Sequence, residues 1–131
     1  MFFFFRSIYF QLHAILSWVG IFLSMGGLYA IYHNKNLNER PHLTSYHSWA
    51  GIGVAASCLG LGLVGSLVLH PDFGMDKTNK TIRFAHKMGA RVTLGLAWFA
   101  TLSGLYQMSP DTTTLVMYGL PLMVFVPFTL M

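Results

Sequence analysis

Three of the six histidines, His13, His47 and His86, each lie within the first turns of a different long hydrophobic stretch. Ionisable side chains inside membrane spans are rare and usually mark functional sites. The imidazole nitrogen is also the commonest protein ligand for metals. The chemistry that these residues indicate is axial coordination of a haem iron.

The composition identifies the class of protein that must position these histidines. Of the 131 residues, 54% are hydrophobic and 9% are charged, and the mean hydropathy is +0.55. A soluble domain of this length needs a mostly polar surface. The sequence therefore predicts an integral membrane protein that forms one unit over residues 1–131.

Four segments are long and apolar enough to cross a bilayer, which requires about 20 mostly apolar residues. They cover residues 7–32, 47–69, 84–106 and 114–131. A helix satisfies its own backbone hydrogen bonds in lipid, whereas an open sheet does not. We therefore expect an all-α membrane protein with four transmembrane helices and lipid around it.

The basic residues predict the orientation of these spans. One side of the membrane would carry Arg6, Lys77, Lys80, Arg83 and Lys87, and the other Lys35 and Arg40. This asymmetry predicts that the N-terminus, the loop near residues 70–83 and the C-terminus are cytoplasmic. Because the basic residues flank spans and form no dense patch, we expect no nucleic-acid partner.

Small residues follow two of the histidines at helical spacing. The strip behind His13 consists of Ser17, Gly20, Ser24 and Gly27, and the strip behind His86 consists of Ala90, Thr93, Ala97, Ala100 and Gly104. Such strips have two explanations, which are close helix packing and space for a porphyrin between helices. A histidine at the head of both strips favours the porphyrin.

The direction of the spans pairs the histidines. The first and third spans run the same way, so His13 and His86 lie at the same cytoplasmic depth. His47 begins the second span and lies near the opposite surface, roughly 25 to 30 Å away at 1.5 Å per helical residue. We expect His13 and His86 to share one haem, and a haem with two imidazole ligands suits electron transfer.

Several motifs closely resemble the cytochrome b561 family, and in particular its small b561-domain transmembrane reductases. These motifs are LHA at 12–14, IYHN at 31–34, LTSYHSWAG at 43–51, FAH at 84–86 and GLPL at 119–122. The intervals between the three span histidines also match the ligand spacing of the family. The resemblance covers nearly the whole chain.

The resemblance implies a six-helix protein with two b-type haems that passes electrons from cytoplasmic ascorbate to monodehydroascorbate or ferric iron. His13 and His86 match the ligands of the cytoplasmic-side haem, and His47 matches one ligand of the other haem. The four spans correspond to the third to sixth family helices, so the helix with the partner of His47 is missing. Three explanations are open: the chain is an N-terminally shortened form, a partner chain supplies the missing ligand, or only the cytoplasmic-side haem is bound. We expect the shortened form, with one haem b per chain, in an endomembrane or vesicle, where family members are often homodimers.

The substrate residues are predicted on both sides of the membrane. Lys77, Lys80 and Arg83 precede His86 and could bind the ascorbate anion, although the positive-inside rule alone also explains them. His33 matches a substrate-contacting histidine of the family on the far side. His42 and His70 adjoin prolines in loops and are not expected at the iron.

A haem-free protein is the alternative. In this interpretation the four spans form a membrane anchor or an interaction subunit, and the histidines serve in packing.

Overall fold

The chain folds into four helices. The computed structural model describes the backbone of residues 2–130 and the side chains of residues 8–121, 123 and 124. The helices are α1 (Phe2–Leu37), α2 (Tyr46–Leu67), α3 (Lys80–Met108) and α4 (Thr112–Leu130), and no strand occurs within residues 2–130. The all-α prediction is confirmed, and each helix coincides with one predicted span. The side chain of Arg6, used in the orientation argument, lies outside the described ones.

Side-chain caps determine where three of the helices begin. The Ser45 hydroxyl accepts a hydrogen bond from the Ser48 amide, and the Asn79 side-chain oxygen accepts one from the Ile82 amide. The Asp111 carboxylate accepts one from the Thr114 amide. These bonds satisfy amide groups that have no partner within the first turn of a helix. Because Asn79 caps α3, that helix starts at Lys80, ahead of the predicted start at residue 84.

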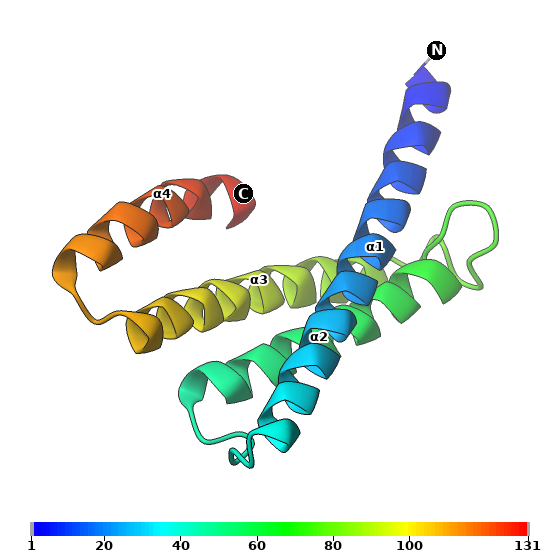
Figure 1. Ribbon diagram of the computed structural model, residues 1–131. Coiled ribbons are helices and arrows are strands. Elements are labelled where there is room, and N and C mark those ends of the chain that lie inside the picture. Colours follow the sequence, from blue (N-terminus) through cyan, green and yellow to red (C-terminus); the bar gives the residue numbers. More distant parts are fainter. Residues whose placement is uncertain (1, 131) are drawn as a thin grey trace.

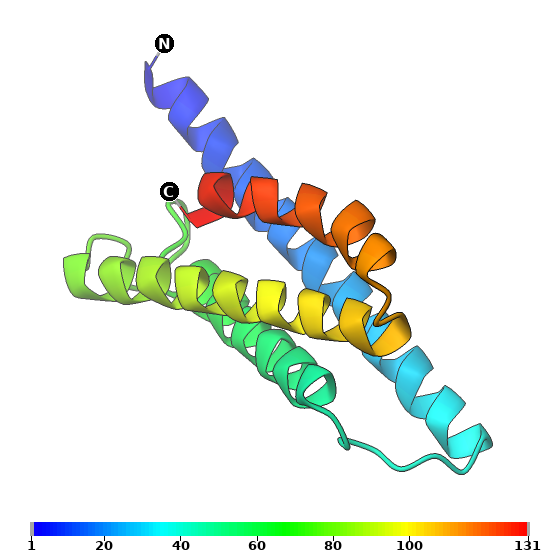
Figure 2. The same ribbon diagram turned by 90° about the vertical axis from the view of Figure 1, so that its left-hand side faces the viewer.

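The helices form an open arrangement around an antiparallel pair. Figure 1 shows α2 and α3 running side by side in opposite directions, with α1 crossing them and α4 beside α3. Figure 2, from the side, again shows α4 folded back along α3. Contacts join α1 to α2, α2 to α3 and α3 to α4, and no described α-carbon of α1 lies within 8 Å of one in α3. The first and third helices are therefore separated by a gap.

Two contacts join α1 to α2 beside this gap. The indole nitrogen of Trp18 donates a hydrogen bond of 2.8 Å to the Ser66 hydroxyl. One turn further along, the buried Ile21 faces Gly62, where an added Cβ would lie 2.6 Å from its Cδ1. Because Gly62 has no side chain, the two helices can approach closely.

Most large apolar side chains face outward. Among the described side chains, the buried hydrophobic ones are Ile21, Ala50, Ala55 and Ala100, whereas Leu23 and Val92 are each 72% exposed. An apolar surface of this extent is typical of a protein surrounded by lipid or by a partner.

Two of the four helices are long and apolar enough to cross a membrane by themselves. These are residues Ile8–Leu37 of α1 and Tyr46–Leu67 of α2, among the described residues. The prediction of four spans is therefore supported in part. That α3 and α4 also cross the membrane stays a prediction.

Candidate cofactor site

Two pockets occupy the gap between α1 and the α2–α3 pair. The first pocket, at the end that holds His13 and His86, has a volume of about 610 Å³. The second pocket, at the end that holds His47, has a volume of about 620 Å³. Both volumes lie in the range of roughly 300 to 1,000 Å³ that is usual for small-molecule and cofactor sites.

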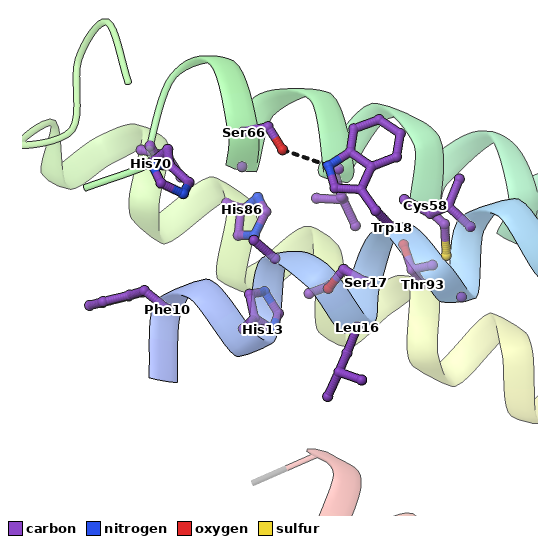
Figure 3. Close-up of a pocket in the computed structure, with 18 of the residues that line it drawn as sticks. Phe10, His13, Leu16, Ser17, Trp18, Cys58, Ser66, His70, His86 and Thr93 are labelled. Carbon is purple, nitrogen blue, oxygen red and sulfur yellow. Dashed lines mark hydrogen bonds between the residues drawn. The ribbon is translucent and has the colours of Figure 1, made fainter. Parts of the chain in front are cut away.

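The first pocket brings together two of the three span histidines. His13 projects from α1 and His86 from α3, and both rings line this pocket. Figure 3 shows His13 on α1 below His86 on α3, with the Trp18–Ser66 hydrogen bond beside them. His47 lines only the second pocket. The structure thus has the grouping that the direction of the spans predicts.

The ring of His86 is packed against the neighbouring helix α2. The contact lies at Gly65, where an added Cβ would lie 3.2 Å from Cε1. The Nδ1 atom is buried and has no hydrogen-bond partner. A buried polar atom without a partner is rare and costly, and coordination to a metal is one interaction that satisfies an imidazole nitrogen. His13 is more exposed along the pocket wall.

His47 has one ring nitrogen occupied and one available. Its Nδ1 lies 2.7 Å from the Ala100 carbonyl oxygen. A carbonyl oxygen only accepts hydrogen bonds, so Nδ1 carries the proton and donates it. In the neutral ring, Nε2 then keeps its lone pair. Metal-ligating histidines are commonly oriented by this kind of hydrogen bond.

The two pockets adjoin one another. Ser24, Val54 and Ala97 line both. The strip of α1 behind His13 lines the pockets throughout its length, and the strip of α3 behind His86 does so from Ala90 to Ala100. The small residues therefore surround space between α1 and α3, and these two helices do not pack closely on each other.

The predicted cytoplasmic substrate residues differ in their position. Arg83 lines the first pocket, and its guanidinium donates hydrogen bonds to the Lys77 carbonyl, one of them 2.8 Å long from Nε. The Lys77 ammonium donates to the Pro71 carbonyl at 2.9 Å. Lys77 and Lys80 are exposed and lie outside the pocket lining. Arg83 alone of the three reaches the wall that His13 and His86 share.

His33 lies on the outer surface near the second pocket. Its ring is exposed and stacks on Tyr29, with the ring centroids 6.1 Å apart. It does not line the second pocket, but Tyr32, Lys35 and His42 do. Other polar groups therefore share the second pocket with His47, and His33 does not.

Two loop histidines reach pocket walls although their sequence context gave no such signal. His70 lines the first pocket, and it stacks on Phe73 with centroids 3.8 Å apart. His42 lines the second pocket, and its Nε2 bonds to the Asn36 side chain at 2.7 Å. Their positions follow from the turn that each loop makes after its helix. Spacing along the chain does not reveal such a turn.

The donor set fits a haem. No group of three His, Cys, Asp or Glu residues that could hold a bare metal ion occurs among the described side chains. A porphyrin supplies four nitrogen ligands itself, so the protein needs to provide only the axial ones. The first pocket has the two imidazoles of His13 and His86 on facing walls, an unpartnered ring nitrogen on His86, and small residues between larger apolar ones.

Comparison with models of protein families identifies a match. The family model described as eukaryotic cytochrome b561 matches residues 2–110. No curated protein and no solved structure was found that matches the chain.

Proposed function

Because this chain belongs to the eukaryotic cytochrome b561 family, we propose that it moves electrons from cytoplasmic ascorbate to monodehydroascorbate or ferric iron on the opposite side. Membership of the family makes it a membrane-embedded redox protein that transfers electrons across the membrane through haem b. The donor, the acceptor and the residues that serve them are the proposal.

The observation that carries the proposal is the first pocket. His13 and His86 line it together, and the buried Nδ1 of His86 lacks a partner. We assign these two residues as the axial ligands of a haem b. When bound, haem b supplies one-electron chemistry, and two imidazole ligands favour electron relay over reactions at the iron.

The remaining residues of the pocket position the cofactor and insulate it from water. Small side chains of α1 and α3 leave room for a flat group in the gap. Trp18 and Ser66 hold α1 against α2, which maintains the width of that gap. The two pockets share Ser24, Val54 and Ala97 in their walls, so the two cavities lie next to each other along the helices.

Ascorbate binding is assigned to the basic residues around the first pocket. Ascorbate is an anion at neutral pH, and charge-assisted hydrogen bonds are the strong ones. Arg83 lies on the wall of the first pocket. Lys77 lies in the loop before α3, and Lys80 is the first residue of α3. On the opposite side, His33 is assigned to the acceptor.

We propose one haem per chain, held in the first pocket. His47 offers an oriented Nε2 to the second pocket, but the other histidine on that wall, His42, has its Nε2 bonded to Asn36. The N- and C-termini are assigned to the cytoplasm, in an endomembrane or vesicle.

Spectroscopy of the purified protein tests this function. The detergent-solubilised protein should give a reduced-minus-oxidised spectrum with a b-type α-band and a pyridine haemochrome ratio near one haem per chain. His13→Ala and His86→Ala should each abolish the α-band. His70→Ala, in the same pocket but outside the helices, is the control and should keep it.

Two results would contradict the proposal. A colourless purified protein would favour the haem-free membrane anchor, and a haem ratio near two would overturn the assignment of one haem.

A further inference from the structure

The α2–α3 pair contains two equivalent histidine–glycine contacts near its opposite ends. His47 at the start of α2 lies over Gly104 near the end of α3, and His86 near the start of α3 lies over Gly65 near the end of α2. The same number of residues separates His47 from Gly65 as separates His86 from Gly104. Each helix therefore contributes one ring and receives the other.

These contacts leave no room for a Cβ at Gly104 and little room for one at Gly65. A Cβ added at Gly104 would lie 2.7 Å from His47 Nδ1 and 2.8 Å from Cε1, and one added at Gly65 would lie 3.2 Å from His86 Cε1. The ring of His47 would have to move for any larger residue to fit at Gly104. At Gly65 the ring of His86 would be displaced by a smaller amount.

Three other glycines in the same two helices also have close neighbours, but the atom nearest to each belongs to a leucine or isoleucine and not to a histidine ring. Gly60 of α2 and Gly95 of α3 have no atom within 4 Å of an added Cβ. Glycine inside a helix is unfavourable relative to alanine, so a glycine at a ring contact needs a reason that packing supplies. Gly60 and Gly95 provide matched controls.

The environment of His47 shows what the contact does. Its Nδ1 donates to the Ala100 carbonyl, one turn before Gly104 on the same face of α3. The ring is thus held by the hydrogen bond to the Ala100 carbonyl at Nδ1 and by packing against the backbone of Gly104. These two constraints together set the plane of the ring and the direction of Nε2.

We propose that Gly65 and Gly104 are positioning residues, and that they set the ring planes of His86 and His47. Because a glycine has no side chain, each ring can pack directly against the backbone of the neighbouring helix. For His86 this inference rests on its proposed role as a haem ligand. For His47 it concerns the packing of the ring and needs no cofactor. The packing of α2 on α3 then orients both rings.

The first experiment compares Gly65→Ala with Gly60→Ala in haem-loaded protein. The readouts are the low-spin electron paramagnetic resonance signal, which depends on the relative orientation of the axial imidazole planes, and the haem ratio. Gly65→Ala should shift the signal or lower the haem ratio at least twofold, and Gly60→Ala should match the wild type. If wild type binds haem and the two variants are alike, the inference is overturned for His86.

The second experiment uses the thermal midpoint of unfolding in detergent and needs no haem. Gly104→Ala should lower this midpoint by a few degrees or more relative to Gly95→Ala. In a His47→Ala background, where the ring is gone, Gly104→Ala should lower the midpoint no more than Gly95→Ala does. Equal effects of Gly104→Ala in both backgrounds would overturn the inference for His47.

The two proposals fail in different ways. Loss of the haem assignment appears as a colourless wild-type protein, and in that case the double-mutant comparison at His47 and Gly104 still decides whether the glycine positions the ring.

Discussion

The three span histidines share a residue type but have different partners. His47 donates through Nδ1 to a backbone carbonyl, whereas the same atom of His86 is buried without a partner. His13 lies more exposed on the wall of the first pocket. The neighbours of an imidazole therefore determine which nitrogen remains available to a ligand.

Arg83 should affect ascorbate oxidation more than Lys80 does. Arg83 lines the first pocket and Lys80 does not, and Coulomb attraction between exposed groups weakens with distance and salt. We expect Arg83→Gln to slow haem reduction by ascorbate several-fold and Lys80→Gln to slow it less, measured by stopped-flow absorbance. Arg40→Gln, on the opposite loop, is the control; a slower rate in that variant would contradict the assigned side.

His33→Ala should weaken acceptor reduction and leave the haem spectrum unchanged. Its ring is exposed, stacks on Tyr29 and lies outside both pocket linings. Reoxidation of the reduced protein by monodehydroascorbate or ferric chelate measures the effect. Loss of the α-band in this variant would show a structural role instead.

At the scale of the elements, the caps and the contacts between helices define the site. Asn79 caps α3 about two turns before His86, so His86 lies within the helix and not at its frayed end. The α1 helix is tied to α2 near the first pocket by Trp18 and Ser66. Because α1 contacts α2 and not α3 within the described part of the chain, the distance between α1 and α3 is set by how each of them packs on α2.

Trp18→Phe should destabilise the protein by about 0.5–1.5 kcal/mol, because it removes one hydrogen bond of 2.8 Å between two helices. Unfolding in detergent, followed by circular dichroism, measures the change. Ser66→Ala should cost a similar amount, and the double variant should cost little more than either alone. Fully additive effects would show that the two side chains do not interact.

At the scale of the whole molecule, the gap between α1 and α3 is the main feature. Both pockets lie in it and they meet at three shared residues. The outward-facing apolar side chains suit a lipid environment. A path for electrons along this gap requires that its two ends face opposite sides of the membrane.

Single cysteines can test that requirement. Cys58 is the one cysteine in the sequence, so Cys58→Ser provides a background for Asn38→Cys, Thr78→Cys and Pro110→Cys in three loops. A membrane-impermeant maleimide applied to oriented vesicles should label Thr78→Cys from the cytoplasmic side and the other two from the opposite side. Labelling of Asn38→Cys and Thr78→Cys from one side would contradict a membrane-spanning α2.

The sequence by itself determined the helices and the grouping of the histidines. Hydropathy and helical periodicity depend on neighbours a few residues apart, so they place His13 with His86 and His47 at the other end. They also place the small residues on the faces that line the pockets. The resemblance to the family, carried by short motifs, is confirmed by the match over residues 2–110.

Only the tertiary structure decided which atoms meet between helices. The contacts of His86 with Gly65 and of His47 with Gly104 and Ala100 depend on how far α2 is shifted along α3. The positions of His42 and His70 depend on loop turns. Hydropathy constrains neither the shift between two helices nor the path of a loop, because many registers bury equal apolar area, and close packing of particular side chains selects one of them.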